Sequence, residues 1–306
     1  MNKNSLNFVK DEFLQDGVVS FGKTLQDSEC DKAAKLVIDS RPWDQSIFRE
    51  YDEVFGSKRH LNVAPLKGGF NLADKMDLNF IESNKIFTST LENILGKNYE
   101  CLLKKIVVST PLSIIPDWLK KVSEKKLDGH LAQYIKPEFR DISYFSGIDY
   151  HMDLIDYPDF DGNYVTVYVY LTDVDESYSP LHIIPKSHRL GATLFPHNLK
   201  KTNNESTVQY SKNNKDYDTF EVRKLVAEKG SVFLWTALTL HGTKLSNALK
   251  PRVSVRYTFS KKSSSIGLID ELYKDLKSIS LKKTTRDDIK FKKNEVVSIK
   301  NQRFLV

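Results

Sequence analysis

The segment SYFSGIDYHMDL (143–154) begins a series of short stretches that are rich in Val, Ile, Tyr, Phe and Thr. Residues of these types favour β-strands, and polar turns separate one stretch from the next. The series continues through YVTVYVYLTDV (164–174), PLHIIPKSH (180–188), GSVFLWTALTLHG (230–242) and RVSVRYTFS (252–260). Several short strands at irregular spacing predict a β-sandwich or jelly roll in this half of the chain.

The N-terminal half has a helical pattern instead. Residues 5–40 look mostly helical, apart from the strand-like GVVSFG at 17–22. KIFTSTLENILG (85–96) repeats an amphipathic helical pattern and ends at a glycine, which commonly follows a helix. CLLKKIVVS (101–109) then predicts a strand. The chain as a whole is therefore expected to be mainly β, with flanking helices.

No stretch is rich enough in Pro, Gly or Ser to divide the chain, so we expect a single domain over residues 1–260. Residues 110–146 interrupt the β pattern with a charged, helix-like sequence, which predicts a helical insertion beside the entrance to a site. Residues 261–306 contain twelve Lys or Arg against six Asp or Glu, which equals the formal charge of +6 for the whole chain. This basic C-terminal extension is either a solubilising, partly helical segment or a contact for an anionic partner.

Composition argues against several classes of protein. No stretch reaches the roughly 18 apolar residues of a membrane-spanning helix, and the first residues lack the apolar run of a secretory signal. Cys30 and Cys101 are too few for a disulfide framework and suit a reducing compartment. Because the positive charge is confined to the tail, a broad nucleic-acid-binding surface is not expected. These features predict a cytoplasmic protein without a membrane span.

His151 and Asp153 are the first candidates for chemistry. On a strand the side chains of residues i and i+2 point to the same face, so this imidazole and carboxylate would converge. A second histidine would complete the set of two histidines and one carboxylate that Fe(II) oxygenases use, with coordination positions left open. A His-x-Asp triplet arises by chance in many chains, so the triplet alone favours a structural role.

Two features later in the chain, His241 and Arg252, support a functional role for the His-x-Asp triplet. The strand-like GSVFLWTALTLHG ends with His241 and Gly242, where a strand terminus would place the imidazole at the mouth of a barrel. Arg252 follows and shares one face of the predicted strand 252–260 with Ser254 and Arg256. A buried arginine needs an anionic partner. A guanidinium beside a hydroxyl can hold the distal carboxylate of a dicarboxylate. The alternative for Arg252 is an ion pair at the surface.

In this order the pieces resemble the phytanoyl-CoA dioxygenase family of Fe(II)- and 2-oxoglutarate-dependent oxygenases, over about residues 8–260. The resemblance depends on the opening FVKDEFLQDGVVSF (8–21), His151-x-Asp153, the strand 164–174, PLHIIPKSHRLG (180–191) and the ending His241-Gly242…Arg252-x-Ser254. It implies a double-stranded β-helix, a jelly roll of the cupin type. It also implies Fe(II) at His151, Asp153 and His241, with Arg252 and Ser254 on the far carboxylate of 2-oxoglutarate and O2 as the second cosubstrate.

The resemblance bears on three further positions. It places Tyr168 near the cosubstrate, with core packing as the alternative. It also implies a cosubstrate contact from Lys104 or Lys105 without deciding between them. Two departures stand out: Lys186 replaces the usual Gly of a Pro-Gly-Ser-His turn, and Ser231 replaces an Asp that often follows the preceding glycine.

The remaining histidines carry less weight. His188 belongs to the turn and is expected to make a structural hydrogen bond. His182 could line the pocket, although a core or surface position is favoured. His60, His130 and His197 have no supporting context.

The implied activity is oxidation of a small-molecule metabolite or biosynthetic intermediate, with release of succinate and CO2. Related halogenases have a small residue at the position of Asp153 to make room for halide, so the carboxylate favours hydroxylation. Two alternatives remain open: a non-catalytic metal- or ligand-binding β-barrel, and a tailoring oxygenase that acts on a carrier-tethered substrate contacted by the basic tail. No residue identifies the substrate, and the insertion at 110–146 would shape the pocket that binds it.

Overall fold

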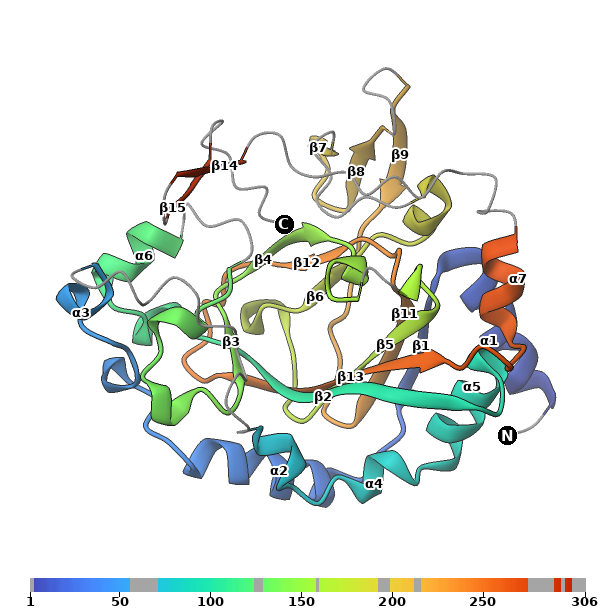
Figure 1. Ribbon diagram of the computed structural model, residues 1–306, viewed down its shortest axis with the longest axis horizontal. Coiled ribbons are helices and arrows are strands. Elements are labelled where there is room, and N and C mark those ends of the chain that lie inside the picture. The colour runs from blue at the N-terminus through green and yellow to red at the C-terminus, as the bar shows by residue number, and fades with distance from the viewer. Residues whose placement is uncertain are drawn as a thin grey trace.

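Two β-sheets lie face to face at the centre of the molecule, with helices along the outer side of the larger sheet (Figure 1). The computed structural model describes residues 3–55, 71–123, 129–157, 160–191, 199–211, 216–274, 289–292 and 295–298.

The larger sheet has six strands in the order β1-β11-β5-β13-β2-β3. Their bounds are β1 Val18–Lys23, β11 Ser231–Thr236, β5 Tyr164–Tyr170, β13 Arg252–Lys261, β2 Tyr99–Ser109 and β3 Ser143–Phe145. Neighbouring strands are antiparallel except β2 and β3, which are parallel. Strands that are far apart in the sequence thus lie side by side within one sheet.

The smaller sheet has four antiparallel strands in the order β10-β6-β12-β4. Their bounds are β10 Arg223–Lys224, β6 Leu181–Ile183, β12 His241–Thr243 and β4 Ile148–His151. A small buried cluster joins the sheets, with Tyr168 and Trp235 from the larger and Leu181 and Ile183 from the smaller. Two sheets that close on a shared interior confirm the predicted jelly roll.

The two faces of β13 belong to different environments. Val253, Val255 and Tyr257 are buried in the main apolar core, which the helices share. Arg252 and Ser254 alternate with them and face the interior between the sheets, where Ser254 lies opposite Tyr170 on β5. The alternation predicted for residues 252–260 is thus correct. It supplies the interior with polar groups.

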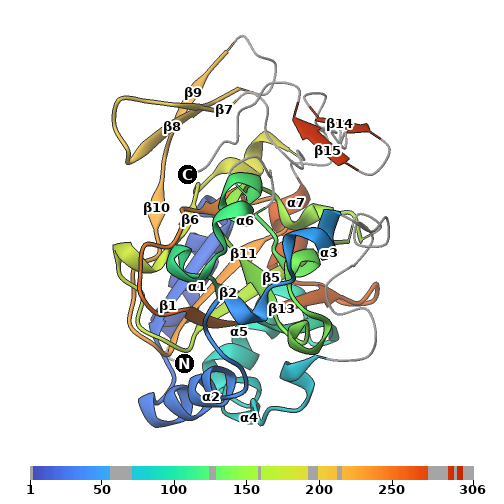
Figure 2. The same cartoon turned by 90° about the vertical axis from the view of Figure 1, so that its left-hand side faces the viewer.

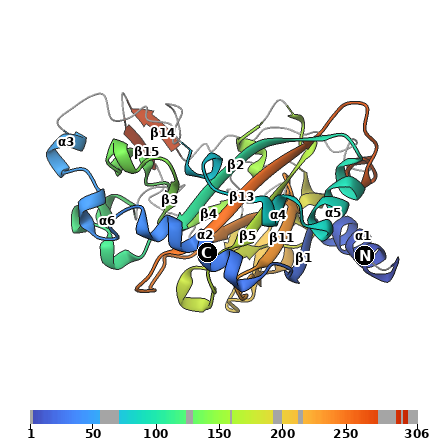
Figure 3. The same ribbon diagram turned by 90° about the horizontal axis from the view of Figure 1, so that it is seen from below.

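Seven α-helices are described: α1 Lys3–Asp16, α2 Asp27–Asp39, α3 Tyr51–Phe55, α4 Asn79–Glu82, α5 Lys85–Leu95, α6 Asp117–Ser123 and α7 Leu268–Lys274. The helices predicted within 5–40 and 85–96 are present. Helices α2 and α4 lie below the larger sheet, as the view from below shows (Figure 3).

Helix α5 illustrates why these segments fold locally. Phe87, Leu91 and Ile94 are buried at helical spacing and pack into the main core. The Asn84 side chain caps the helix by accepting hydrogen bonds from the backbone N–H groups of the second and third helical residues, at 3.0 and 3.3 Å. Gly96 ends it with a φ of +83°, a conformation that glycine adopts at low cost.

The segment 110–146 contains less helix than its sequence suggests. Helix α6 is the one α-helix among its described residues, and the rest forms short 3-10 turns before β3. The Leu112 N–H donates to the Ser246 carbonyl at 3.1 Å, which ties the segment to the loop that precedes β13. Arg41 holds its far end through an ion pair with Asp141 at 2.8 Å. Residues 124–128 lie outside the described residues.

The first part of the basic extension packs with the domain. Strand β13 continues to Lys261, and α7 buries Ile269, Leu272 and Tyr273 while contacting α1 and α5. Farther on, only the paired strands β14 Ile289–Lys292 and β15 Glu295–Ser298 are described.

A separate three-stranded sheet, β7 Leu199–Lys201, β8 Thr207–Tyr210 and β9 Asp218–Glu221, extends away from the jelly roll (Figure 2). None of the described helices has both the length and the apolar character needed to cross a membrane.

Candidate metal centre

The two predicted histidine ligands lie on adjacent strands of the smaller sheet. His151 is the last residue of β4 and His241 the first of β12, and the two are directly opposite in register, with ring centroids 4.3 Å apart. The prediction of one strand ending at His241 is wrong. Strand β11 ends at Thr236, and the chain then turns into the other sheet. Asp153 has also left the strand of His151 and begins a 3-10 turn, Asp153–Ile155.

The three side chains nevertheless converge. Asp153 Oδ1 is 3.5 Å from His241 Nε2 and 4.0 Å from His151 Nε2. Their ligand atoms all lie within 4.8 Å of one another, and no other group of three His, Cys, Asp or Glu in the described part of the chain is placed to hold a metal. Two imidazoles and one carboxylate on one side of an ion form the donor set of a facial triad.

Backbone carbonyls orient both imidazoles. His151 Nδ1 lies 2.8 Å from the Asp149 carbonyl, and His241 Nδ1 lies 3.0 Å from the Thr239 carbonyl. A carbonyl can only accept, so each Nδ1 carries the proton and each Nε2 keeps a lone pair aimed at the shared space. Burial, and then the neighbouring His241, lower the pKa of His151 to about 4, so this ring is neutral and able to bind a metal at pH 7.

The Asp153 carboxylate is held on both of its oxygens. Oδ2 accepts hydrogen bonds from Thr166 Oγ1 at 2.6 Å and from Trp235 Nε1 at 2.9 Å. Oδ1 faces the histidines and accepts from Arg256 at 2.7 Å. Burial alone would raise the pKa of Asp153, but Arg256 and His241 outweigh burial and hold it well below its usual range. The group is therefore an anion, as metal binding requires.

These supporting residues were given no role from the sequence. Thr166 and Trp235 are directly opposite in register on β5 and β11 and therefore share the interior face, but that pairing joins segments almost 70 positions apart. Arg256 could have been suspected, because it shares the face of Arg252 on β13. Nothing in the sequence shows that it reaches Asp153.

Arg252 lies deep between the sheets. The residue is 1% exposed, and its guanidinium donates to the Ser179 carbonyl and, at 3.3 Å, to the Tyr168 hydroxyl, but it forms no ion pair with any described carboxylate. Its Nε and the buried hydroxyl of Ser254 have no hydrogen-bond partner among the described residues. Tyr170 also flanks the guanidinium, at 5.7 Å from its ring centre. A buried cation beside an unpaired hydroxyl fits an anionic ligand.

Register distinguishes the two candidate lysines. Lys104 points away from the interior and pairs with Glu82 at 3.1 Å. Lys105 is directly opposite Arg256 and therefore shares the interior face of the sheet. Burial, and then Arg256, lower the pKa of Lys105 to about 8, and its ammonium makes no hydrogen bond or ion pair with the described residues.

The other histidines do not join the centre. His182 is buried on the opposite face of β6 from Ile183, since it pairs with Gly242 whereas Ile183 pairs with His241. His188 is buried in the turn, and its ring fills the space beside Gly17. His130 stacks edge-on against a phenylalanine, whereas His60 and His197 lie outside the described residues.

One departure from the family pattern lies in a turn and the other at the start of a strand. Lys186 adopts a φ of +67°, which explains why glycine is usual there. Ser231 begins β11 and is buried.

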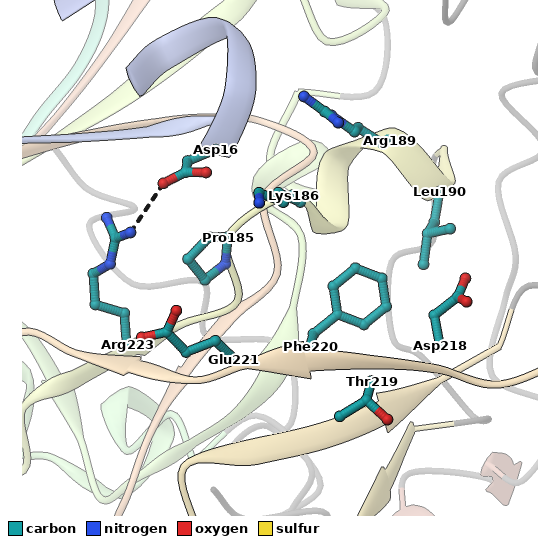
Figure 4. Close-up of a pocket in the computed structure, with 10 residues that line it drawn as sticks. All are labelled: Asp16, Pro185, Lys186, Arg189, Leu190, Asp218, Thr219, Phe220, Glu221 and Arg223. Carbon is teal, nitrogen blue, oxygen red and sulfur yellow. Dashed lines mark hydrogen bonds and ion pairs between the residues drawn. The ribbon is translucent and has the colours of Figure 1, made fainter. Parts of the chain in front are cut away.

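A surface groove of about 440 Å³ lies apart from this centre (Figure 4). It is lined by the end of α1, the turn after β6, and strands β9 and β10, and Arg223 closes one side through an ion pair with Asp16 at 2.9 Å. None of the predicted site residues lines it. Its acidic and basic side chains balance, so its charge does not indicate a ligand.

Comparison with known proteins agrees with this geometry. The profile of the phytanoyl-CoA dioxygenase (PhyH) family matches residues 13–253. No curated protein matches the chain. Among solved structures, the non-heme α-ketoglutarate-dependent epimerase SnoN from nogalamycin biosynthesis is 14% identical, with a TM-score of 0.52 over 85% of this chain and 84% of that chain.

Two further structures are similar at lower scores. EvdO2 from Micromonospora carbonacea var. aurantiaca, complexed with 2-oxoglutarate, is 11% identical with a TM-score of 0.49 over 85% of this chain and 92% of its own. EctD from S. alaskensis, in its apo form, is 12% identical with a TM-score of 0.47 over 85% and 77%. At such identities the likeness to SnoN supports the fold alone. The profile match covers most of the chain, including both histidines, the aspartate and Arg252, and it shows that this protein belongs to the phytanoyl-CoA dioxygenase family of Fe(II)- and 2-oxoglutarate-dependent oxygenases.

Proposed function

We propose that this protein is an Fe(II)- and 2-oxoglutarate-dependent dioxygenase that hydroxylates a small-molecule metabolite or biosynthetic intermediate and releases succinate and CO2. The observation that carries the proposal is that one jelly roll contains both a set of metal-ligand side chains and a buried cation without a counter-ion among the described residues. A preorganised His-Asp-His set forms one site, and a buried arginine without a carboxylate partner among the described residues lies on β13 of the facing sheet.

The residues present fit both ligands. His151, Asp153 and His241 would hold the iron, which when bound supplies the oxidising chemistry that the side chains lack. Arg252 and Ser254 would hold the distal carboxylate of 2-oxoglutarate, because the guanidinium Nε and the Ser254 hydroxyl lie on one strand face and are among the buried polar atoms without a hydrogen-bond partner in the described residues.

Other residues would position the cosubstrate. The Tyr168 hydroxyl accepts a hydrogen bond from Arg252 and the Tyr168 ring stacks on Trp235, so Tyr168 would help to position the guanidinium. Lys105 supplies a second interior cation and is favoured over Lys104 for a further cosubstrate contact, since Lys104 pairs with Glu82 on the other face. The carboxylate of Asp153 fills the position that a halide would need, which favours hydroxylation over halogenation.

Anaerobic loading with Fe(II) and 2-oxoglutarate tests the proposal. The wild-type protein should give a weak visible charge-transfer band, and His151→Ala should lose it because one of three protein ligands is missing. His182→Ala is the matched control, since this buried histidine faces away from the centre and its loss should leave the band in place. Wild-type protein without such a band would contradict the assignment.

The choice between hydroxylation and another oxidation needs the products. Succinate release with a panel of metabolites should show coupled turnover, and mass spectrometry should show a gain of one oxygen atom. A non-catalytic barrel would bind Fe(II) and 2-oxoglutarate without releasing succinate. The anionic partner of the basic tail stays a prediction, and comparing truncated with full-length protein on free and carrier-tethered substrates tests it.

A further inference from the structure

Arg256 forms a bridge between two carboxylates at the metal centre. One nitrogen, Nη2, donates both to Asp153 Oδ1 and to Asp156 Oδ2, each at 2.7 Å. Arg256 lies on β13, opposite Tyr168 on one side and Lys105 on the other, so it projects into the interior between the sheets. Its side chain is 11% exposed. An ion pair this well buried is more than a surface contact.

The oxygen that Arg256 contacts is the one that a metal ion needs. Asp153 Oδ1 is the atom that faces both histidine Nε2 atoms, whereas Oδ2 is engaged by Thr166 and Trp235. An ion bound to Oδ1 would therefore lie close to the guanidinium, and two positive charges at such a separation repel each other strongly in a site with little water. Arg256 and a divalent cation thus compete for one carboxylate oxygen.

Asp156 offers the guanidinium a second partner at the rim of the centre. It directly follows the 3-10 turn that Asp153 begins, and its side chain is 35% exposed compared with 1% for Asp153. A small movement of Arg256 toward Asp156 would take its charge toward solvent and free Oδ1. Lys105 faces Arg256 across the strands, and its positive charge opposes any movement inward.

We propose that Arg256 is a positioning residue that occupies the metal-facing oxygen of Asp153 in the metal-free protein, and that Asp156 draws it away when the ion binds. The pair thereby sets the metal affinity of the centre. The inference rests on the proposed function, because it takes His151, Asp153 and His241 as the metal ligands. It assigns Arg256 no contact with the substrate.

Titration of the metal-free protein with Co(II), followed by calorimetry and by visible absorption, tests the proposal. Arg256→Gln should bind Co(II) about tenfold more tightly than the wild type, because the competing charge is gone. Arg256→Lys keeps the charge and should stay within about threefold of the wild type. Asp156→Asn should bind about tenfold more weakly, because Arg256 then has Asp153 as its only carboxylate partner. Thermal melts without metal show whether each variant is folded. On addition of Co(II), the Tm of Arg256→Gln should rise more than the Tm of the wild type or of the other variants.

A double variant separates this mechanism from a general effect of charge. If Asp156 acts through Arg256, Asp156→Asn should change the Co(II) affinity by less than about twofold in the Arg256→Gln background. Weaker binding by Arg256→Gln would overturn the inference, since it would mean that Arg256 merely supports Asp153. An undiminished effect of Asp156→Asn in the double variant would overturn it as well. In either case, loss of Co(II) binding in His151→Ala would still support the assignment of the metal ligands. Absence of Co(II) binding by the wild type would refute both the metal centre and the role of Arg256.

Discussion

Replacing Arg252 with methionine should make the cosubstrate-free protein more stable and should weaken its binding of 2-oxoglutarate. Methionine keeps most of the side-chain volume but not the charge. In the structure the buried guanidinium has two hydrogen-bond acceptors, the Ser179 carbonyl and the Tyr168 hydroxyl, and no described carboxylate partner. Stability and binding should therefore change in opposite directions.

The magnitude follows from two opposing contributions. The two lost hydrogen bonds cost about 1 kcal/mol each, whereas burying a charge without a counter-ion costs several kcal/mol that methionine avoids. The free energy of unfolding should rise by about 1 kcal/mol, which corresponds to an increase in Tm of roughly 2–4 °C. Loss of a buried contact between charged groups should weaken 2-oxoglutarate binding by about 2–4 kcal/mol, or roughly 30- to 1,000-fold.

Differential scanning fluorimetry without 2-oxoglutarate measures the first effect, and titration of the Fe(II)–2-oxoglutarate band measures the second. Arg41→Met is the matched control. Arg41 is equally buried but pairs with Asp141 at 2.8 Å, so its loss leaves a carboxylate without its partner and should cost about 3–5 kcal/mol. If Arg252→Met destabilised the protein as much as Arg41→Met and bound 2-oxoglutarate normally, the reasoning would be refuted.

Three further outcomes follow from the contacts at and around the centre. Trp235→Phe removes the donor to Asp153 Oδ2 but keeps an aromatic ring, so Co(II) affinity in a calorimetric titration should fall by about 10- to 100-fold. Burial lowers the pKa values of His182 and His188 to about 4, below the 6.5 of the unfolded chain. The unfolded state then binds more protons between these values, so the free energy of unfolding in urea should fall as pH drops from 6.5 to 4, by up to about 1.4 kcal/mol per pH unit for each histidine. Gly17→Ala should unfold at a much lower urea concentration, because its Cβ would lie 2.4 Å from His188 Nδ1 at a φ of +71°.

Each of these three predictions has a control or an outcome that would contradict it. Trp43→Phe loses a hydrogen bond to a backbone carbonyl far from the centre, so it should leave Co(II) affinity unchanged. Gly22→Ala meets no atom within 4 Å at a φ of +65°, and it should cost only the backbone strain of about 1 kcal/mol. A flat urea stability between pH 6.5 and 4 would show that the buried histidines bind protons in the folded protein. If Gly17→Ala and Gly22→Ala lowered the stability in urea equally, the close contact with His188 would not be the cause.

Local sequence patterns predicted many of the helices and strands of the fold. The alternation in residues 252–260 identified a strand with one apolar and one polar face, because side chains on a strand alternate with a period of two. The apolar spacing and the terminal glycine of 85–96 identified α5, because the burial of one helical face and the end of a helix are both local properties. The residues that we propose as ligands of the metal and the cosubstrate were also chosen from their types and their order along the chain.

The tertiary structure decided how those residues meet. The sequence suggested that His151 and Asp153 share a strand and that His241 ends another, whereas a 3-10 turn and a change of sheet bring them together. Neither change is visible in periodicity, since a turn of three residues leaves no repeating pattern. The choice of Lys105 over Lys104 depended on register with β13, because a shift by one residue would reverse the face of each side chain.

The order of residues along the chain therefore determined which side chains we propose as ligands of iron and 2-oxoglutarate, because their chemical types and spacing are properties of the sequence. Only the tertiary structure showed that Asp153 accepts a hydrogen bond from Trp235 on one oxygen and from Arg256 on the other. Such contacts join strands that are distant in sequence. Their physical basis is the packing of two sheets on one interior, which no local pattern contains.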